Sequence, residues 1–167
     1  MRISPSIAAA LVALAAASAG AYAATSGAAQ IRFSDLFRLP VGARGLEPTQ
    51  KLLALDGHAV RMVGYMARRE VPTPGSFVLV PMPVTLGDED EGLSDDLPAA
   101  AIFVHLKGEL SGSIEVPHTP GLVQVRGTLR IGAAEEIDGR VSAVRIELDE
   151  AATRAFLQLG DAATCRH

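Results

Sequence analysis

Two segments of this chain alternate apolar and polar residues, and each has a glycine near its centre. Residues 122–131 place an apolar residue or Gly127 at every second position, and residues 59–66 repeat this pattern around Gly64. Alternation with a period of two indicates a β-strand that buries one face. A glycine inside a strand permits a sharp coil or the close approach of another backbone, which the curved strands of small barrels need. The two segments therefore predict a curved β-sheet.

Three shorter segments complete the predicted sheet. Residues 77–80 and 101–106 are compact apolar runs rich in β-branched and aromatic residues, and residues 140–148 form a fifth strand. The apolar phase of this fifth strand shifts between Val141 and Val144, which predicts a β-bulge within it. Five short strands, two of them with a central glycine, predict a mainly β protein with a small five-stranded OB-like barrel. A small β-sandwich is the alternative.

Short helices are predicted on either side of the strands. One covers residues 48–55, with Pro48 at its start. The other covers residues 150–159, with Asp149 as the N-cap and Gly160 as its end.

The chain divides into four segments along its length. Residues 1–23 are a predicted signal peptide, and residues 24–45 form an N-terminal extension. Residues 46–160 form the OB-like β domain, and residues 161–167 are a flexible tail. One domain is the usual number for a chain of 167 residues.

The first 23 residues have the features of an export signal. Arg2 precedes an apolar run over residues 7–17, and Ala21-Tyr22-Ala23 supplies a cleavage pattern of small residues. A second such pattern ends at Ala19, so the signal could be cleaved after Ala19 or after Ala23. The alternative is a membrane anchor, but the run is too short to span about 30 Å of hydrocarbon. We therefore expect a periplasmic protein with no stable membrane insertion after cleavage of the signal.

Composition argues against one class of partner. The formal charge is −4, and aromatic residues make up 4% of the chain. A nucleic-acid-binding protein normally presents a basic face and stacking aromatic side chains. No nucleic-acid partner is expected.

Three segments resemble a known protein family. They run from Leu55 to Met66, from Phe77 to Pro81 and from Val123 to Leu129, and they are similar to an exported bacterial family of unknown function with an OB-like β-barrel. The resemblance implies a small periplasmic protein, and some members are associated with ABC-type transport systems. Many members carry a Cys-x-His element after the second strand. Residues 82–87 here contain neither residue type, so metal chemistry at that element does not carry over.

The most charged part of the chain is an acidic stretch over residues 88–96. Six of its nine residues are acidic: Asp88, Glu89, Asp90, Glu91, Asp95 and Asp96. A calcium-binding EF-hand is excluded, because Gly92 and Ala99 stand where that loop requires ligands. The stretch is predicted to be a contact surface for a basic partner, such as an envelope or ABC-transport protein. The alternative is a divalent-cation site that uses Asp88, Asp90, Asp95 and Asp96.

Two histidines are candidates to complete such a cation site. His105 lies near the end of the third strand, and His118 lies between two prolines. Neither has the local spacing of a zinc motif, so only the fold can bring them together. Cys165 has no partner cysteine in the chain, which excludes an intramolecular disulfide.

No motif of a known catalytic site occurs in the sequence. It contains no Gly-x-Ser-x-Gly, no His-Glu-x-x-His, no Walker loop and no Gly-x-Gly-x-x-Gly. We therefore predict no catalytic residues, no cofactor and a non-enzymatic accessory or binding protein. The alternatives are a divalent-cation-binding protein and an enzyme whose site assembles only in three dimensions.

Overall fold

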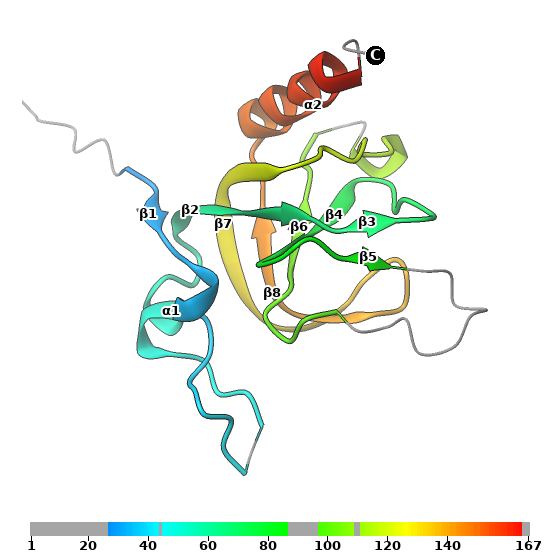
Figure 1. The fold of residues 1–167 in the computed structure, drawn as a ribbon. Coiled ribbons are helices and arrows are strands. Elements are labelled where there is room, and N and C mark those ends of the chain that lie inside the picture. The colour runs from blue at the N-terminus through cyan, green and yellow to red at the C-terminus, as the bar shows by residue number, and fades with distance from the viewer. Residues whose placement is uncertain (1–26, 44, 87–96, 109–110, 165–167) are drawn as a thin grey trace, which may run out of the picture.

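A computed structural model describes residues 27–43, 45–86, 97–108 and 111–164, without the side chains of residues 111 and 159–164. The predicted signal peptide, the acidic stretch and Cys165 lie outside these residues. The strands and helices, labelled in Figure 1, are β1 (Ala29–Gln30), a 3-10 helix (Phe33–Asp35), α1 (Gln50–Ala54), β2 (Ala59–Met66), β3 (Arg68–Arg69), β4 (Ser76–Val80), β5 (Thr85–Leu86), β6 (Ile102–His105), a 3-10 helix (Ser111–Ser113), β7 (Leu122–Glu135), β8 (Val141–Glu147) and α2 (Glu150–Thr164).

The strands form one main sheet and one small one. The six-stranded sheet has the order β1-β2-β4-β6-β8-β7, and β3 pairs with β5 separately. In addition β2 pairs with β7 over seven residues of each strand, so the hydrogen-bonded neighbours run from β2 through β4, β6, β8 and β7 back to β2. The pairs β1–β2 and β6–β8 are parallel, and β7 bends strongly along its length (Figure 1). The prediction of a mainly β protein is confirmed.

The main core lies on one face of the six-stranded sheet. The inward side chains of β2, β7 and β8 alternate with exposed or half-buried ones, as the sequence pattern predicts. Every residue of β4 is buried, because its two faces meet different apolar clusters. Phe77 and Leu79 belong to the main core, whereas Val78 and Val80 pack with Leu86 in a second cluster. Cover on both faces explains why residues 77–80 form an unbroken apolar run.

The two strand glycines mark close approaches, as predicted. A Cβ at Gly127 would lie 2.8 Å from the carbonyl carbon of Glu147 in β8. A Cβ at Gly64 would lie 2.8 Å from the ring of Phe33 and 2.9 Å from Leu79. The strands can therefore pack this closely only because both positions lack a side chain.

The predicted bulge is on the wrong strand. β8 alternates regularly, with Ser142, Val144 and Ile146 buried. The register shift lies in β7, between Ile131 and Ala134. Sequence reasoning counted Val141 as inward because it is apolar, but it is 67% exposed, and the small inward residue at 142 is polar.

Both α-helices form near their predicted positions, with one error at an end. The carboxylate of Asp149 accepts a hydrogen bond from the Ala152 amide at 2.7 Å, which is the predicted N-cap interaction. The prediction that Gly160 ends the helix is wrong, because α2 continues to Thr164. Phe156 anchors α2 by stacking on Phe77 of β4, with ring centroids 4.6 Å apart. One glycine costs a helix only about 1 kcal/mol, so it does not by itself stop one.

The segment before α1 is part of the packed structure. β1 extends the main sheet beside β2, and the side chains of Ile31 and Leu36 that follow it are fully buried. In the part of the chain that is described, no helix is both long and apolar enough to cross a membrane.

Candidate functional site

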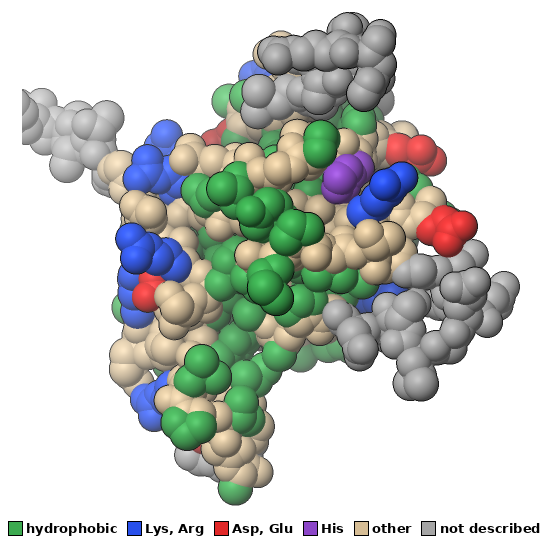
Figure 2. All heavy atoms as spheres, in the orientation of Figure 1, with side chains coloured by type: hydrophobic (Ala, Val, Ile, Leu, Met, Phe, Trp, Pro, Cys, Tyr) green, Lys and Arg blue, Asp and Glu red, His purple; other side chains and the backbone are tan. Residues whose placement is uncertain are grey.

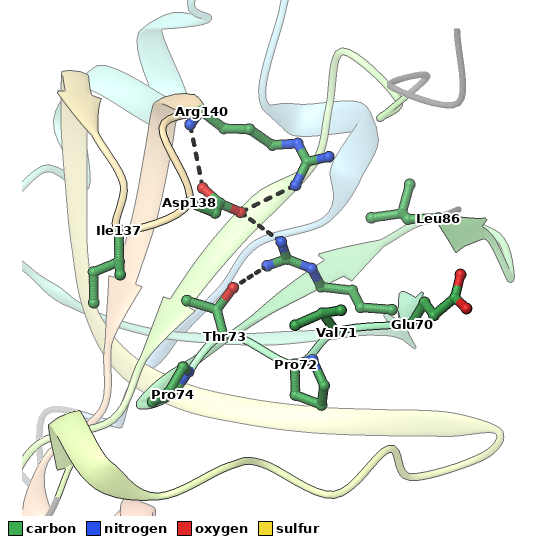
Figure 3. A pocket seen from close by; sticks show the side chains of 10 residues that line it. Glu70, Val71, Pro72, Thr73, Pro74, Leu86, Ile137, Asp138 and Arg140 are labelled. Carbon is green, nitrogen blue, oxygen red and sulfur yellow. Dashed lines mark hydrogen bonds and ion pairs between the residues drawn. The ribbon is translucent and has the colours of Figure 1, made fainter. Parts of the chain in front are cut away.

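A cavity of about 340 Å³ lies between the connection from β2 to β4 and the hairpin that joins β7 to β8 (Figure 3). Residues 69–74 form one wall, residues 137, 138 and 140 form the facing wall, and Leu86 of β5 closes a side. Two loops that are distant in sequence thus shape one concave surface.

The β7–β8 hairpin holds its side of the cavity by backbone hydrogen bonds. The Glu136 amide donates to the Arg140 carbonyl at 2.8 Å, and the Gly139 amide donates to the Glu136 carbonyl at 2.9 Å. Gly139 has a φ of 78°, a left-handed conformation that glycine adopts without strain. This tight turn leaves Ile137 at its tip, whereas Asp138 faces the opposite wall (Figure 3).

Asp138 joins the two walls through two arginines. Its Oδ2 lies 2.7 Å from Nη2 of Arg69 and 3.1 Å from Nη1 of Arg140, and its Oδ1 accepts from the Arg140 amide at 3.2 Å. Arg69 also donates to Thr73 at 2.5 Å. The three charged side chains are only 13–17% exposed, so they form a largely dry polar base to the cavity, here called the Arg–Asp clamp (Arg69, Asp138 and Arg140).

The clamp sets the ionisation of its carboxylate. Burial alone would raise the pKa of Asp138, but hydrogen bonds from the Arg140 amide and the Arg69 guanidinium outweigh it. Together with the positive charge of Arg69 and a hydrogen bond from the Arg140 guanidinium, they hold the pKa of Asp138 below its ordinary value of 3.8. Asp138 is therefore ionised at neutral pH.

The lowered pKa predicts an acid-sensitive contribution to stability. A carboxylate whose folded pKa lies below its unfolded pKa stabilises the fold above the unfolded value and ceases to do so as the pH falls through the folded value. We expect the midpoint of urea unfolding to fall as the pH drops below about 4, and Asp138→Asn to remove part of this dependence. Asp35, whose pKa is also lowered, mainly by a hydrogen bond from Lys51, adds to the slope in both proteins. Equal slopes for the wild-type protein and the variant would contradict the prediction.

The rim of the cavity is apolar and exposed. Val71 on one wall is 66% exposed, and Ile137 on the other is 77% exposed. Apolar side chains also gather in the middle of the face shown in Figure 2.

The predicted contact residues lie outside the described part of the chain. Asp88, Glu89, Asp90, Glu91, Asp95 and Asp96 all belong to the undescribed stretch. In the sequence the acidic stretch follows the cavity wall closely. Leu86 of that wall ends β5, and Asp88, the first acidic residue, is two positions later.

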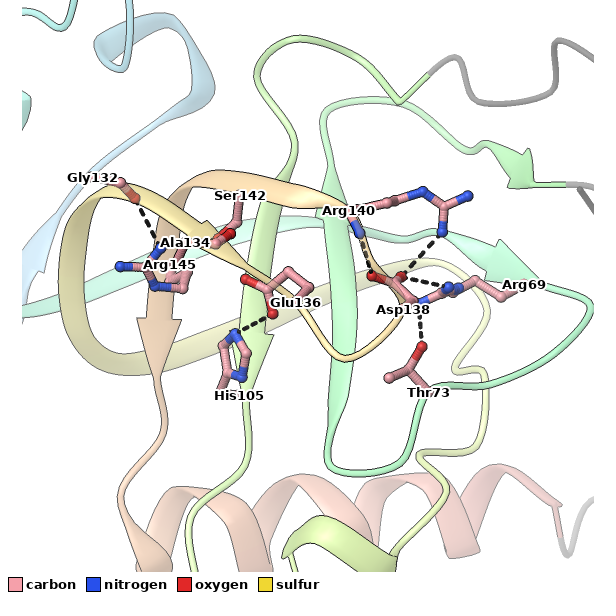
Figure 4. Close-up of polar contacts among 10 residues, drawn as sticks. All are labelled: Arg69, Thr73, His105, Gly132, Ala134, Glu136, Asp138, Arg140, Ser142 and Arg145. Atoms are coloured by element: carbon pink, nitrogen blue, oxygen red, sulfur yellow. Dashed lines mark hydrogen bonds and ion pairs between the residues drawn. The ribbon is translucent and has the colours of Figure 1, made fainter.

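The two candidate histidines line different cavities and contact different residues. His118 is exposed, and its Nε2 lies 3.3 Å from the Met66 carbonyl oxygen. His105 lies beside a separate cavity of about 480 Å³, where its Nε2 is 3.0 Å from Oε2 of Glu136 (Figure 4). Among the described residues, no three metal-binding side chains come together.

Sequence reasoning missed Arg69, Glu136 and Asp138. None belongs to a motif, and each lies at the end of a strand or in a turn. The Asp138-Gly139 pair between two strand patterns is a hairpin signal and locates the turn, but it does not indicate which loop the turn will meet.

Comparisons with known proteins identify no family for the chain. No protein-family model matches the sequence, and a search of curated proteins gives no significant match. Among solved structures, the chain is similar to a DUF3299 family protein from Pseudomonas aeruginosa PAO1. The two share 13% sequence identity with a TM-score of 0.41, over 72% of this chain and 91% of the other. A likeness of this degree establishes no common function.

Proposed function

We propose that this chain is an exported, non-enzymatic binding protein that docks a protein of the cell envelope at the cavity between the two loops. The observation that carries the proposal is the pair of exposed apolar side chains, Val71 and Ile137, at the rim of a cavity whose base is a paired, largely buried clamp.

The order of the strands supports an OB-like barrel. Pairing of β2 with both β4 and β7 returns the neighbours to their starting strand, which is how a sheet closes on itself. In OB folds, ligands bind beside the loop between the first two strands and the loop between the last two. In this chain those loops correspond to the β2–β4 connection and the β7–β8 hairpin, the two walls of the cavity.

Docking at this cavity has a physical rationale. Covering Val71 and Ile137 would remove apolar surface from water, at about 25 cal/mol per Å². The clamp already holds both loops in place, so binding would cost little ordering of the chain. Because the clamp charges are paired with each other, the contact itself is expected to be apolar.

The acidic stretch suggests the charge of the partner. It starts two positions after Leu86 of the cavity wall in the sequence, and it supplies six negative charges to a partner that docks there. A partner with an apolar anchor and nearby basic residues fits both features, because opposite charge speeds association. We propose an envelope transport protein, the class that the family resemblance suggests.

Site-specific photo-crosslinking in living cells tests the proposal. A benzophenone amino acid at Ile137 or Val71 is expected to give one discrete crosslinked product. The matched control is Leu122, which is 64% exposed and does not line this cavity. Products of equal intensity from Leu122, or no product from either rim position, would contradict docking here.

A second measurement separates the acidic stretch from the rim. The crosslinked product is expected to form more slowly when Asp88, Asp90, Asp95 and Asp96 are all changed to Asn, and more slowly in the native protein at high salt. Exposed charges are screened as ionic strength rises. A rate of formation that is the same in the fourfold variant and at high salt would exclude the acidic stretch from the contact.

A further inference from the structure

A buried carboxylate and an imidazole meet beside the second cavity, away from the Arg–Asp clamp. Glu136 comes from the β7–β8 hairpin and His105 from the end of β6 (Figure 4). We propose that His105 and Glu136 together hold a first-row divalent transition-metal ion of the Zn²⁺ class. The proposal does not depend on partner docking.

The pair has the spacing of two ligands on one ion. Nε2 of His105 lies 3.0 Å from Oε2 of Glu136, and among the described residues this nitrogen has no hydrogen-bond partner of suitable geometry. Donor atoms that each lie about 2.0–2.1 Å from a common zinc ion are roughly 3 Å apart. The nitrogen and the oxygen are therefore placed to share a third atom.

The burial of Glu136 calls for a positive partner. Its side chain is only 5% exposed, and its other oxygen, Oε1, is buried with no hydrogen-bond partner among the described residues. A buried carboxylate oxygen without a partner is costly. A cation bound beside Oε2 would offset the negative charge of this buried carboxylate.

The donor types select the class of ion. Imidazole nitrogen binds zinc, copper, nickel and iron well, whereas Ca²⁺ and Mg²⁺ prefer oxygen ligands alone. Two protein donors leave the other coordination positions to water in the cavity of about 480 Å³. Such a site has an open side.

Other charged groups line the same cavity. Glu135 and Glu147 contribute negative charge, and Lys107 and Arg145 contribute positive charge. Arg145 is held in place by hydrogen bonds to the Gly132 carbonyl at 2.8 Å and to Ser142 at 3.0 Å. The acidic pair favours a cation, while the basic pair is suited to an anion bound on the open side of the metal.

Calorimetry with Zn²⁺ on the full mature protein tests the site. We expect saturable binding of one ion per chain, weakened about 100-fold or more in His105→Ala and in Glu136→Gln, because loss of even an indirect contact to a metal costs 10–100-fold. Glu136→Gln keeps the shape of the side chain, so it tests the charge without creating a cavity. Circular dichroism without metal confirms that each variant is folded.

Three control variants isolate this pair from the other candidate donors. His118→Ala removes an exposed histidine of another cavity, the double change Cys165→Ser with His167→Ala removes the donors of the C-terminus, and the fourfold Asp→Asn variant removes the acidic stretch. All three are expected to bind Zn²⁺ as the wild-type protein does. The proposal is overturned if wild-type protein shows no saturable binding below about millimolar Zn²⁺, or if Glu136→Gln binds with wild-type affinity. Loss of the ion without loss of the crosslink at Ile137 would leave the docking proposal intact.

Discussion

Gly127→Ala is expected to lower the free energy of unfolding by about 3 kcal/mol or more, at the upper end of the cost of overpacking. The new Cβ would lie 2.8 Å from the Glu147 carbonyl carbon and closer still to its oxygen. These atoms belong to the backbone of β8, which is paired with β7 on one side and β6 on the other. Neither strand can move away without loss of ladder hydrogen bonds, so the strain is not relieved locally.

Two other glycines provide graded controls for this result. Gly64→Ala meets the side chains of Phe33 and Leu79, which can rotate, so we expect a smaller loss of about 1–2 kcal/mol. Gly42 has no atom within 4 Å of the added Cβ, and Gly42→Ala is expected to change stability by less than about 0.5 kcal/mol. Urea unfolding of the three variants measures the series. A loss at Gly127 no larger than that at Gly64 would contradict the close backbone approach.

Asp138→Ala is expected to destabilise the protein by about 3 kcal/mol, the lower end of the range for breaking a buried ion pair. The change leaves the guanidinium groups of Arg69 and Arg140, now side by side, without the carboxylate that joins them. Because the same contact holds the β7–β8 hairpin against residues 69–74, we also expect faster amide hydrogen exchange at the hairpin tip.

The exposed ion pair between Lys51 and Asp35 is the matched control. Its two atoms lie 2.7 Å apart, the same separation as in the Arg69–Asp138 pair, but its side chains are 51% and 25% exposed. Lys51→Ala is therefore expected to cost less than about 1 kcal/mol. The double variant Arg69→Ala with Asp138→Ala should be less destabilised than the sum of the single variants, since removal of one partner already removes the contact. Additive losses would show that Arg69 and Asp138 are not coupled.

Residues with a regular pattern were predicted well. Alternation placed β2 and β7 and identified their inward faces, because a strand turns every second side chain to the same side. The predicted close approach at Gly64 and Gly127 also follows from a local signal, since glycine is unfavourable inside a strand unless space is short. Two predictions that rested on the type of a single residue are wrong. Val141 is apolar but exposed, and Gly160 does not end α2.

The candidate sites could not be predicted in the same way. His105 is a candidate metal ligand because histidine commonly binds metals. Its partner Glu136 is 31 positions away, a separation that matches no known metal-binding motif. Arg69 and Asp138 are separated by 69 positions, and each resembles an ordinary surface charge in the sequence. Only the pairing of strands determines which charged residues face one another.

The sequence by itself determined the mainly β character, the position of most strands and the faces that they bury. These features depend on local properties, namely the alternation of apolar and polar residues and the size of each side chain. The tertiary structure decided that β2 pairs with both β4 and β7, that the two loops share a cavity, and that Asp138 and Glu136 meet Arg69 and His105. Contacts of this kind join residues that are far apart along the chain. Their free energy depends on distance and burial in space, and no local pattern of residues encodes either quantity.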